Sequence, residues 1–398
     1  MQSENDNKNR PEKALGIYVH VPYCIRKCRY CDFVSFEKAP EDAYFDKLAE
    51  DIELAGNAFG NGTEYYVDTL FFGGGTPSLA SAAQLKKVLD AVRENFVLRE
   101  PEITIEVNPE TVTPQKAAEL KELGFNRVSM GVQSLDDGVL SALGRVHSAD
   151  RARQAFHTLR DTGFENINLD LIFGTPRDSA DGSAPVQSLE VWRHTLDEVL
   201  AMRPEHISFY SLQIEEGTPL YKDFAAEKIQ IPSWEENREM YHSAIRQIKE
   251  HGYHHYEVSN AALPGFECRH NLKYWTMQPY LGFGISAHSF IPVYGENARL
   301  TAGYRGEAAW SCTGEPQSLA DLKGDFIFTQ LRLTEGLNAS FYRQLFGEEF
   351  SADFGKALEE LAAKGYIIDT ERGVRLTEKG LDNTNNVMER LLLCIKPQ

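Results

Sequence analysis

Cysteine is scarce in this sequence, and so is positive charge. The 398 residues contain six cysteines, and 59 acidic side chains against 41 basic ones give a formal net charge of −18. A general nucleic-acid-binding protein needs a basic footprint, so the charge balance excludes that class. No apolar run approaches the length of a membrane span, and the polar segment 1–13 lacks the apolar centre of a signal peptide. We therefore expect a cytoplasmic protein whose cysteines stay reduced.

Half of the cysteines lie within eight residues, directly after the apolar run Gly16–Val21. They are Cys24, Cys28 and Cys31, in the spacing C-x3-C-x2-C. Three thiolates this close can bind three irons of a cubane iron–sulfur cluster. No fourth cysteine is near, since Asp32 and Phe33 come next, so the fourth iron would be open to a small molecule. The alternative is a zinc site completed by His20, although structural zinc sites usually consist of two separated ligand pairs.

The cysteine loop, with an aromatic residue (Tyr30) before its last cysteine, resembles that of the radical S-adenosylmethionine (SAM) superfamily. This resemblance implies a 4Fe-4S cluster whose open iron binds SAM through the amino and carboxylate groups of its methionine part. It also implies that reduction of the cluster cleaves SAM to a 5'-deoxyadenosyl radical. The spacing by itself indicates only a site with three thiolates.

From Gly16 to about Asn260 the sequence repeats a unit of β-rich run, loop and amphipathic helix. The expected strands are Gly16–Val21, Thr69–Phe72, Glu102–Val107, Arg127–Val132, Asn166–Phe173 and His206–Leu212. The expected helices are Ala43–Ala55, Ala82–Asn95, Pro114–Leu123, Ala149–Thr162, Gln187–Ala201 and Ser233–Lys249. Six such units predict an α/β fold with a parallel sheet. The pattern fits an open doubly wound sheet or a barrel; the resemblance favours a partial six-stranded (βα)6 TIM-like barrel.

The remainder of the chain has a different pattern. Helices expected at Asp321–Leu333, Ala339–Phe346 and Phe354–Lys364 precede two short strand candidates, which suggests an α+β, winged-helix-like module. We expect four regions: a disordered tail (1–14), a radical-SAM core (15–260), a linker region (261–318) and a C-terminal domain (319–398).

Unusual residues cluster where the expected strands end, which is where parallel α/β proteins place their sites. The second strand runs into Gly73–Ser78 (GGGTPS), a loop in which glycines let a ligand approach the backbone. A tight turn between strand and helix explains this loop equally well. The resemblance to the radical-SAM superfamily implies a role for Gly74, Gly75 and Thr76. They match positions that hold the methionine amino group of SAM in that superfamily.

Further SAM contacts follow from the resemblance to the coproporphyrinogen-oxidase-like branch of the superfamily. The matching positions are Tyr18, Tyr30, Glu106, Gln133, Arg145 and Asp170. An arginine can bind the methionine carboxylate, and Asp and Gln side chains can bind ribose hydroxyls. For Glu106, a solvated charge or a salt bridge at the strand end is the alternative.

The segment His270–Trp275 (HNLKYW) contains a histidine followed by two aromatic residues. Such a histidine is most often part of ordinary packing, but imidazole is also a usual axial ligand of heme iron. The pattern H-N-x-x-Y-W is similar to the heme-associated motif of the HemW family of radical-SAM heme chaperones, and this match makes His270 the candidate heme ligand. Cys268 is nearby, and we interpret it as a small buried residue.

One position separates the two branches of this group. Oxygen-independent coproporphyrinogen III oxidases have a further cysteine after the triad, in C-x3-C-x2-C-x-C, and this chain has Phe33 there. The resemblance therefore implies a chaperone that binds heme and delivers it to a membrane or hemoprotein acceptor, with dimerisation supported by the cluster and SAM. The rival hypotheses are oxidative decarboxylation of coproporphyrinogen III and radical-SAM chemistry on an unrelated substrate.

Overall fold

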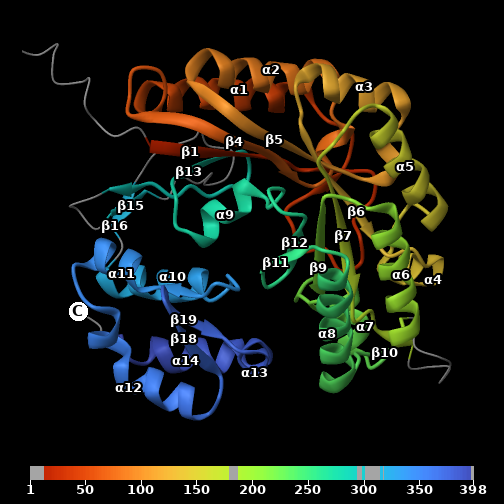
Figure 1. Cartoon of the computed structure of the whole chain (residues 1–398). Coiled ribbons are helices and arrows are strands. Elements are labelled where there is room, and N and C mark those ends of the chain that lie inside the picture. Colours follow the sequence, from red (N-terminus) through yellow and green to blue (C-terminus); the bar gives the residue numbers. More distant parts are fainter. Residues whose placement is uncertain (1–12, 179–186, 294–297, 301–313, 317, 396–398) are drawn as a thin grey trace, which may run out of the picture.

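The computed structural model describes residues 13–178, 187–293, 298–300, 314–316 and 318–395 (Figure 1). The expected tail therefore lies almost wholly outside the described residues. Most of the chain forms one nine-stranded sheet, in the order β11-β12-β9-β7-β6-β5-β4-β1-β13.

All six expected strands are present and lie side by side. They are β1 (Lys13–Val21), β4 (Tyr65–Gly74), β5 (Leu98–Val107), β6 (Arg127–Gln133), β7 (Ile167–Phe173) and β9 (His206–Ser211). Each pairs in parallel with the next one in the chain. This arrangement confirms the expected α/β fold with a parallel sheet.

The sheet also contains three strands that the sequence pattern did not reveal. They are β11 (His254–Glu257), β12 (Asn260–Ala262) and β13 (Tyr280–Phe283). On one side β13 pairs in parallel with β1, and on the other β12 runs antiparallel to β9 and carries β11. Among the described residues β11 and β13 form the two edges, so the curved sheet is a partial barrel. The range 261–318, expected to be a linker, thus contributes strand residues to the main sheet.

Helices cover the outer face of the sheet (Figure 1). They are α1 (Asp42–Phe59), α2 (Ala82–Asn95), α3 (Pro114–Leu123), α5 (Ala149–Asp161), α6 (Leu189–Met202) and α8 (Trp234–Glu250). Two short helices, α4 (Asp137–Leu143) and α7 (Pro219–Ala225), lie instead beside the cysteine loop. Capping residues determine where these helices begin and end, as α3 illustrates. The Thr113 side chain accepts a hydrogen bond from Lys116 N at the start of α3, Pro114 follows it, and Gly124 ends the helix with φ +96°.

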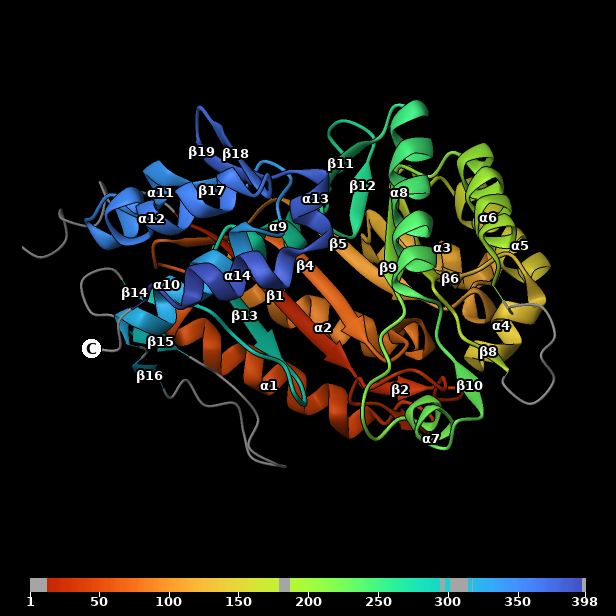
Figure 2. The same ribbon diagram turned by 90° about the horizontal axis from the view of Figure 1, so that it is seen from below.

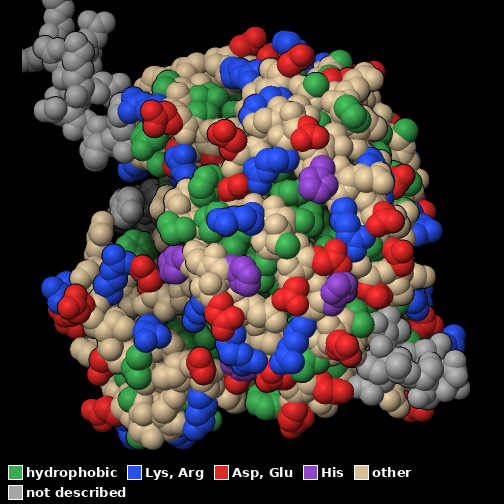
Figure 3. Space-filling view, turned by 45° about the vertical axis from the view of Figure 1, so that its right-hand side comes forward, with side chains coloured by type: hydrophobic (Ala, Val, Ile, Leu, Met, Phe, Trp, Pro, Cys, Tyr) green, Lys and Arg blue, Asp and Glu red, His purple; other side chains and the backbone are tan. Residues whose placement is uncertain are grey.

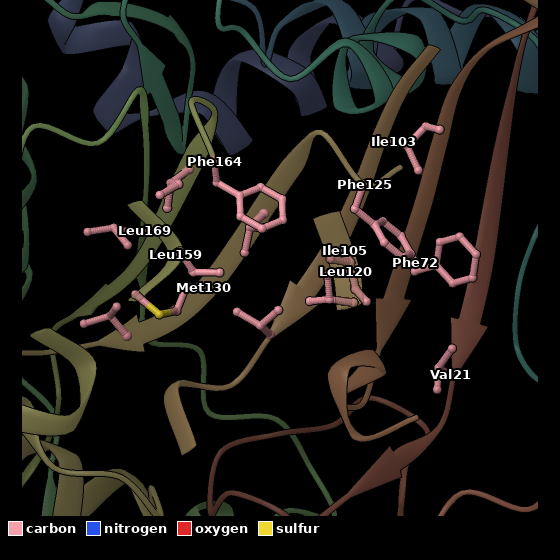
Figure 4. Close-up of a cluster of buried hydrophobic side chains, with 14 of the residues drawn as sticks. Val21, Phe72, Ile103, Ile105, Leu120, Phe125, Met130, Leu159, Phe164 and Leu169 are labelled. Atoms are coloured by element: carbon pink, nitrogen blue, oxygen red, sulfur yellow. The ribbon is translucent and has the colours of Figure 1, made fainter. Parts of the chain in front are cut away.

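The two faces of the parallel strands differ in chemistry. Alternate residues point toward the helices and form the core, among them Val21, Phe72, Ile105 and Met130 (Figure 4). The residues between them face the inside of the barrel, and many are polar. The inward set includes Tyr18, His20, Thr69, Glu102, Thr104, Glu106, Arg127, Ser129, Asn168, Asp170, His206 and Ser208. A parallel sheet buried on both faces is usually apolar on both, so this polar interior is available for function.

The C-terminal part has a hydrophobic core of its own. Its helices are α10 (Leu319–Gln330), α11 (Ala339–Phe346), α12 (Phe350–Ala363), α13 (Glu378–Asp382) and α14 (Thr384–Leu392). Its sheet has the order β17 (Leu337–Asn338), β19 (Gly373–Leu376), β18 (Ile367–Thr370). The two short strands expected there are thus joined by a third, β17, and α12 begins four residues before the expected Phe354. Helix α9 (Arg269–Trp275) lies between this part and the main sheet (Figure 1).

The remaining strands are short and form small separate sheets. β2 (Tyr23–Cys24) pairs with β3 (Phe36–Glu37), β8 (Arg177–Asp178) pairs with β10 (Ile229–Gln230), and β15 (Ala298–Leu300) lies between β14 (Pro292–Val293) and β16 (Gly314–Pro316).

No helix in the described ranges combines the length and the apolar character of a membrane span. On the face shown in Figure 3, acidic and basic side chains are interspersed.

Candidate functional site

A cavity of about 450 Å³ opens at the carboxyl ends of the parallel strands. Eleven of the thirteen residues expected at the site line it. They are Cys24, Cys28, Tyr30, Cys31, Gly74, Gly75, Thr76, Glu106, Gln133, Arg145 and Asp170. Tyr18 and His270 do not line this cavity; they lie deeper in the barrel, where their rings stack with centroids 6.4 Å apart.

The cysteine loop is fixed at both ends and in its middle. Its ends meet where β2 pairs with β3. In the middle, Arg29 N donates to Leu143 O (3.1 Å), Leu220 N donates to Arg29 O (2.9 Å), and the Arg29 guanidinium forms an ion pair with Asp223. The loop therefore spans from β1 to α4 and α7, as Figure 2 shows at the lower edge of the molecule. This bracing holds the three thiols toward the cavity.

Two of the three thiols have polar neighbours. Thr76 Oγ1 lies 3.8 Å from Cys24 Sγ, and Arg145 Nη1 lies 3.4 Å from Cys28 Sγ. Burial raises the pKa of the Cys24 thiol and raises that of Cys31 to about 11. These raised pKa values favour the protonated thiols. A bound metal would favour the thiolates instead, because a coordinating thiol loses its proton.

The donor set fits a cluster better than a single ion. Among the described residues, no group of three His, Cys, Asp or Glu side chains is arranged to hold one metal ion. In a cubane cluster each thiolate binds a different iron, so the three sulfurs need not converge on one point. His20 does not complete a zinc site: its ring nitrogens lie 2.8 Å from Val34 O and 3.1 Å from the Tyr18 hydroxyl.

The glycine loop lies directly against the cysteine loop. Gly74 has φ +113°, and a Cβ there would lie 2.6 Å from the His20 ring. A Cβ on Gly75 would lie 2.7 Å from Tyr23 O. Both positions therefore require glycine for close packing, which agrees with the turn interpretation and also leaves backbone exposed to the cavity.

Glu106 is the central carboxylate of the site. Its Oε2 accepts a hydrogen bond from Gly74 N at 3.0 Å. Burial, reinforced by the nearby Asp170, raises the pKa of Glu106 to about 8. A cationic ligand group placed here would favour the ionised form, so this position suits an amino group.

On the opposite wall, Gln133 and Arg145 lie over Gly131. A Cβ on Gly131 would lie 2.9 Å from Gln133 Nε2 and 3.3 Å from Arg145 Nη2. Arg145 Nη2 donates to Gly131 O at 2.6 Å, while its buried Nε has no hydrogen-bond partner in the described part of the chain. The arginine thus retains a donor for an anionic group. Gln133 itself adopts a left-handed backbone conformation, φ +68°, at the point where β6 ends.

Asp170 is held in place by its neighbours. Its carboxylate accepts hydrogen bonds from Asn168 Nδ2 (2.8 Å) and Ser129 Oγ (3.2 Å), and burial raises its pKa. The cavity thus offers a carboxylate pair, a guanidinium and exposed backbone. These groups fit a ligand that carries an amino group, a carboxylate and a sugar, as SAM does.

His270 lies in a closed environment on α9. Its exposed fraction is 1%. Nδ1 lies 2.9 Å from Thr69 Oγ1, and Nε2 lies 2.9 Å from the Tyr274 hydroxyl. Burial, with nearby Lys273 adding to it, lowers the pKa of His270 to about 3, so the imidazole is neutral. The donor chemistry suits heme iron, but in this conformation Tyr274 covers the nitrogen that would bind it.

The cavity is also lined by residues that were not assigned to the site from the sequence, among them Ser129, Tyr210 and Phe33. Tyr210 is 39% exposed and Phe33 63%, so two aromatic rings face the opening. The alternation of polar and apolar residues along the strands would have identified Ser129 and Tyr210 as inward-facing.

Comparison with known proteins agrees with this geometry. Residues 18–182 match the model of the radical SAM superfamily, and residues 318–382 match that of the HemN C-terminal domain. The heme chaperone HemW of Bacillus subtilis is 34% identical over 379 residues, which cover 91% of this chain and 95% of that protein. The chain belongs to the HemW family.

Other relatives support the same assignment. The heme chaperone HemW of Escherichia coli is 31% identical, with 95% of this chain and 98% of that protein covered. A zebrafish (Danio rerio) protein, radical S-adenosyl methionine domain-containing protein 1, mitochondrial, is 32% identical over 95% of this chain and 87% of its own length. Family membership implies a 4Fe-4S cluster and SAM.

Among solved structures, coproporphyrinogen III oxidase (HemN) from Escherichia coli superposes with a TM-score of 0.76. It is 24% identical, and the match covers 98% of this chain and 91% of that one. At this identity the likeness establishes the shared radical-SAM fold and leaves the activity open.

Proposed function

We propose that this protein is a heme chaperone, which binds heme and transfers it to an acceptor hemoprotein, and which carries a 4Fe-4S cluster and SAM. The observation that favours a chaperone over the oxidase is Phe33. It occupies the position at which the oxidase pattern has a further cysteine, and its exposed ring lines the cavity. The relatives named heme chaperone HemW support the same reading.

The residues of the cavity receive the following proposed roles. Cys24, Cys28 and Cys31 bind three irons of the cluster. Arg145 binds the methionine carboxylate of SAM, and Glu106 with the Gly74–Thr76 loop binds the amino group. When bound, SAM and the cluster supply one-electron chemistry. Gln133 and Asp170 bind the ribose, and Tyr30 packs beside the cluster loop against Val139, Leu143 and Ile172.

Tyr18 and His270 are assigned to the barrel interior. Tyr18 stacks on Phe71 and His270 and so connects the cluster end of the barrel with helix α9. His270 is the proposed heme ligand, reached once Tyr274 leaves Nε2. We further propose a cytoplasmic location, a hemoprotein acceptor that can be membrane-bound, and a homodimer.

A paired experiment tests the proposal. The cluster is reconstituted anaerobically in the full chain. Heme is then titrated while the Soret band is recorded, and transfer to an apo-hemoprotein is followed at the same wavelengths. In parallel, coproporphyrinogen III is incubated with the same protein, SAM and a reductant. We expect heme binding and transfer without formation of protoporphyrinogen. Efficient conversion of coproporphyrinogen, or absence of heme binding, would contradict the proposal.

A further inference from the structure

We propose that Asn168 and His206 are positioning residues for Asp170: with Tyr256 they form a buried chain of hydrogen bonds that holds the Asp170 carboxylate toward the ribose of SAM. This inference rests on the proposed function, in which SAM occupies the cavity and Asp170 binds its ribose. Asp170 lines the cavity, whereas Asn168, His206 and Tyr256 lie behind it in the barrel. The two positioning residues therefore act on the ligand only through Asp170.

The chain of hydrogen bonds crosses three strands of the sheet. Asn168 lies two residues before Asp170 on β7, so both side chains point into the barrel, and Asn168 Nδ2 donates to Asp170 Oδ1 at 2.8 Å. On the neighbouring strand β9, His206 is the direct cross-strand partner of Asn168, with Nδ1 2.6 Å from Asn168 Oδ1. His206 Nε2 lies 2.8 Å from the hydroxyl of Tyr256 on β11. Asn168, His206 and Tyr256 are each at most 4% exposed, so bulk solvent does not reach these bonds.

All four hydrogen-bonding capacities of the Asn168 amide are used. The two hydrogens of Nδ2 go to Asp170 Oδ1 and to Ser129 Oγ, the latter at 2.8 Å. Oδ1 accepts from His206 Nδ1 and from Ser208 Oγ, the latter at 3.1 Å. An amide has two donors and two acceptor lone pairs, so this one is saturated and held in one position. Ser129 Oγ in turn donates to the second oxygen of Asp170 at 3.2 Å. Both oxygens of the carboxylate are thereby oriented from the barrel side.

The far end of the chain determines the direction in which the hydrogens are donated. The Tyr256 hydroxyl accepts from Cys268 N at 3.3 Å, so its own hydrogen is available for His206 Nε2. Burial lowers the pKa of His206 well below its ordinary value, and a neutral imidazole has one N–H and one lone pair. A lone pair on Nε2 places the hydrogen on Nδ1, where Asn168 Oδ1 accepts it. The opposite direction would turn the Asn168 oxygen toward the carboxylate of Asp170 and leave the Tyr256 hydrogen unused in the chain.

The chain also favours the ionised form of Asp170. Burial raises the pKa of Asp170, and the donated hydrogen bonds and the nearby Arg127 guanidinium counter the rise. A carboxylate that accepts several hydrogen bonds keeps its charge more readily, and an ionised carboxylate accepts from a ribose hydroxyl more strongly than a neutral acid does. Loss of the chain would therefore weaken the hold on the ribose end of the ligand, whereas Arg145 on the opposite wall is assigned to the methionine carboxylate.

The test compares SAM with two analogues that lack the 2′ or the 3′ ribose hydroxyl, by equilibrium dialysis on the full, cluster-loaded chain. The wild type should bind SAM more tightly than at least one analogue by about tenfold or more, the usual effect of a hydrogen bond to a charged group. His206→Leu should bind SAM about tenfold more weakly and bind that analogue as the wild type does, so that the preference is lost. His206→Asn should retain the preference, because the amide nitrogen of asparagine is bonded to Cγ, as histidine Nδ1 is, and can donate to Asn168.

His255→Leu is the matched control. His255 is also a buried histidine of the barrel, 5% exposed, but its Nε2 faces Val258 O at 3.4 Å and it takes no part in the chain. We expect the wild-type preference in this variant. Cluster content and thermal unfolding report whether each variant is folded.

A readout without ligand comes from His206 itself. Nitrogen-15 chemical shifts of histidine-labelled protein distinguish the two tautomers, and the His206 signals are those that are missing from His206→Asn. We expect Nδ1–H in the wild type and a mixture of both tautomers in Tyr256→Phe, which removes the hydroxyl that faces Nε2. This measurement depends neither on SAM nor on the folding of His206→Leu.

The outcomes separate the inference from the proposed function. If the wild type binds no SAM, the proposed cofactor site fails and the inference with it. If Asp170→Asn keeps the preference for SAM over the analogues, or the wild type shows none, Asp170 does not bind the ribose, and the inference is overturned while SAM binding remains. If Asp170→Asn loses the preference and His206→Leu keeps it, the positioning role alone is overturned. Equal weakening of SAM and analogue in His206→Leu would mean a structural role only, and an Nε2–H tautomer in the wild type would contradict the chain itself.

Discussion

The guanidinium of Arg145 touches the thiol of Cys28, with Nη1 and Sγ 3.4 Å apart. Arg145 follows α4, on the opposite side of the cavity from β1, so this contact closes the cysteine loop over the strand ends. A second nitrogen donates to Gly131 O, and Nε has no hydrogen-bond partner among the described residues. One side chain thus connects the cluster loop, the barrel wall and the space for a ligand.

We expect Arg145→Gln to retain the cluster and to bind SAM about 10–100-fold more weakly. A hydrogen bond to a charged group contributes about 1.5–3 kcal/mol, and glutamine supplies no charge for a carboxylate. Equilibrium dialysis of SAM against the reconstituted protein measures the effect. Arg153→Gln, which removes an arginine that pairs with Glu198, is the control. Equal SAM affinity in wild type and Arg145→Gln would refute the assigned role.

Replacement of a triad cysteine should abolish the cluster. We expect Cys24→Ser to lose the 4Fe-4S absorbance and to retain substoichiometric iron, because a hydroxyl replaces one of three thiolates. Cys394→Ser, in the last turn of the described chain and far from the cavity residues, should load the cluster normally. Iron and sulfide analysis after anaerobic reconstitution decides the point. A full complement of iron in Cys24→Ser would mean that the triad is not the ligand set.

The raised pKa of Glu106 predicts a pH dependence of stability. Its pKa is about 8 in the folded protein against an ordinary value of 4.5. Between these values the folded state holds a proton that the unfolded chain has lost, so the free energy of unfolding falls as the pH rises. Glu106→Gln should remove this contribution and show a flatter profile. Urea unfolding of the wild type and of Glu106→Gln at pH 4.5 and at about pH 8 measures the change in the free energy of unfolding across this interval. An equal change in the two proteins would contradict the prediction.

The sequence predicted much of the fold because the relevant information is local. The strand–helix repeat, the capping residues of α3 and the spacing of the three cysteines each depend on a few consecutive residues. The strand β13 escaped notice because it is only four residues long and includes Gly282. That glycine is needed because a Cβ would lie 2.2 Å from His288 O, a contact that no sequence period reveals.

The candidate site shows the same difference between what local sequence patterns reveal and what tertiary contacts determine. Spacing, strand ends and the resemblance to the radical-SAM superfamily together pointed to eleven residues that do line one cavity. The enclosure of His270 depends on Thr69, which is 201 positions away in the chain. Likewise, the contact of Arg145 with Cys28 spans 117 positions. Tertiary contacts of this kind decide whether a candidate ligand is open or covered, and they are absent from a linear pattern.

The buried ion pair of α9 provides a test of how firmly this helix is attached to the barrel. Lys273 Nζ lies 2.7 Å from Asp68 Oδ1, and the two side chains are 2% and 15% exposed. Lys273→Met leaves Asp68 with only the more exposed Arg269 as a cationic partner, 3.3 Å away, so we expect a loss of about 1.5–3 kcal/mol in the free energy of unfolding. Adding Asp68→Asn should recover a large part of that loss.

The exposed pair of Lys86 and Asp90 on α2 supplies the matched control. Lys86→Met should change the free energy of unfolding by at most about 0.5 kcal/mol, as expected for a surface pair one helical turn apart. Chemical denaturation of the wild type and of the three variants gives the comparison. If Lys273→Met were as mild as Lys86→Met, α9 would be held chiefly by the Glu102 hydrogen bonds and by the packing of His270. In that case Lys273 would contribute little to the attachment of α9, and Asp68 would act on this helix through Arg269 alone.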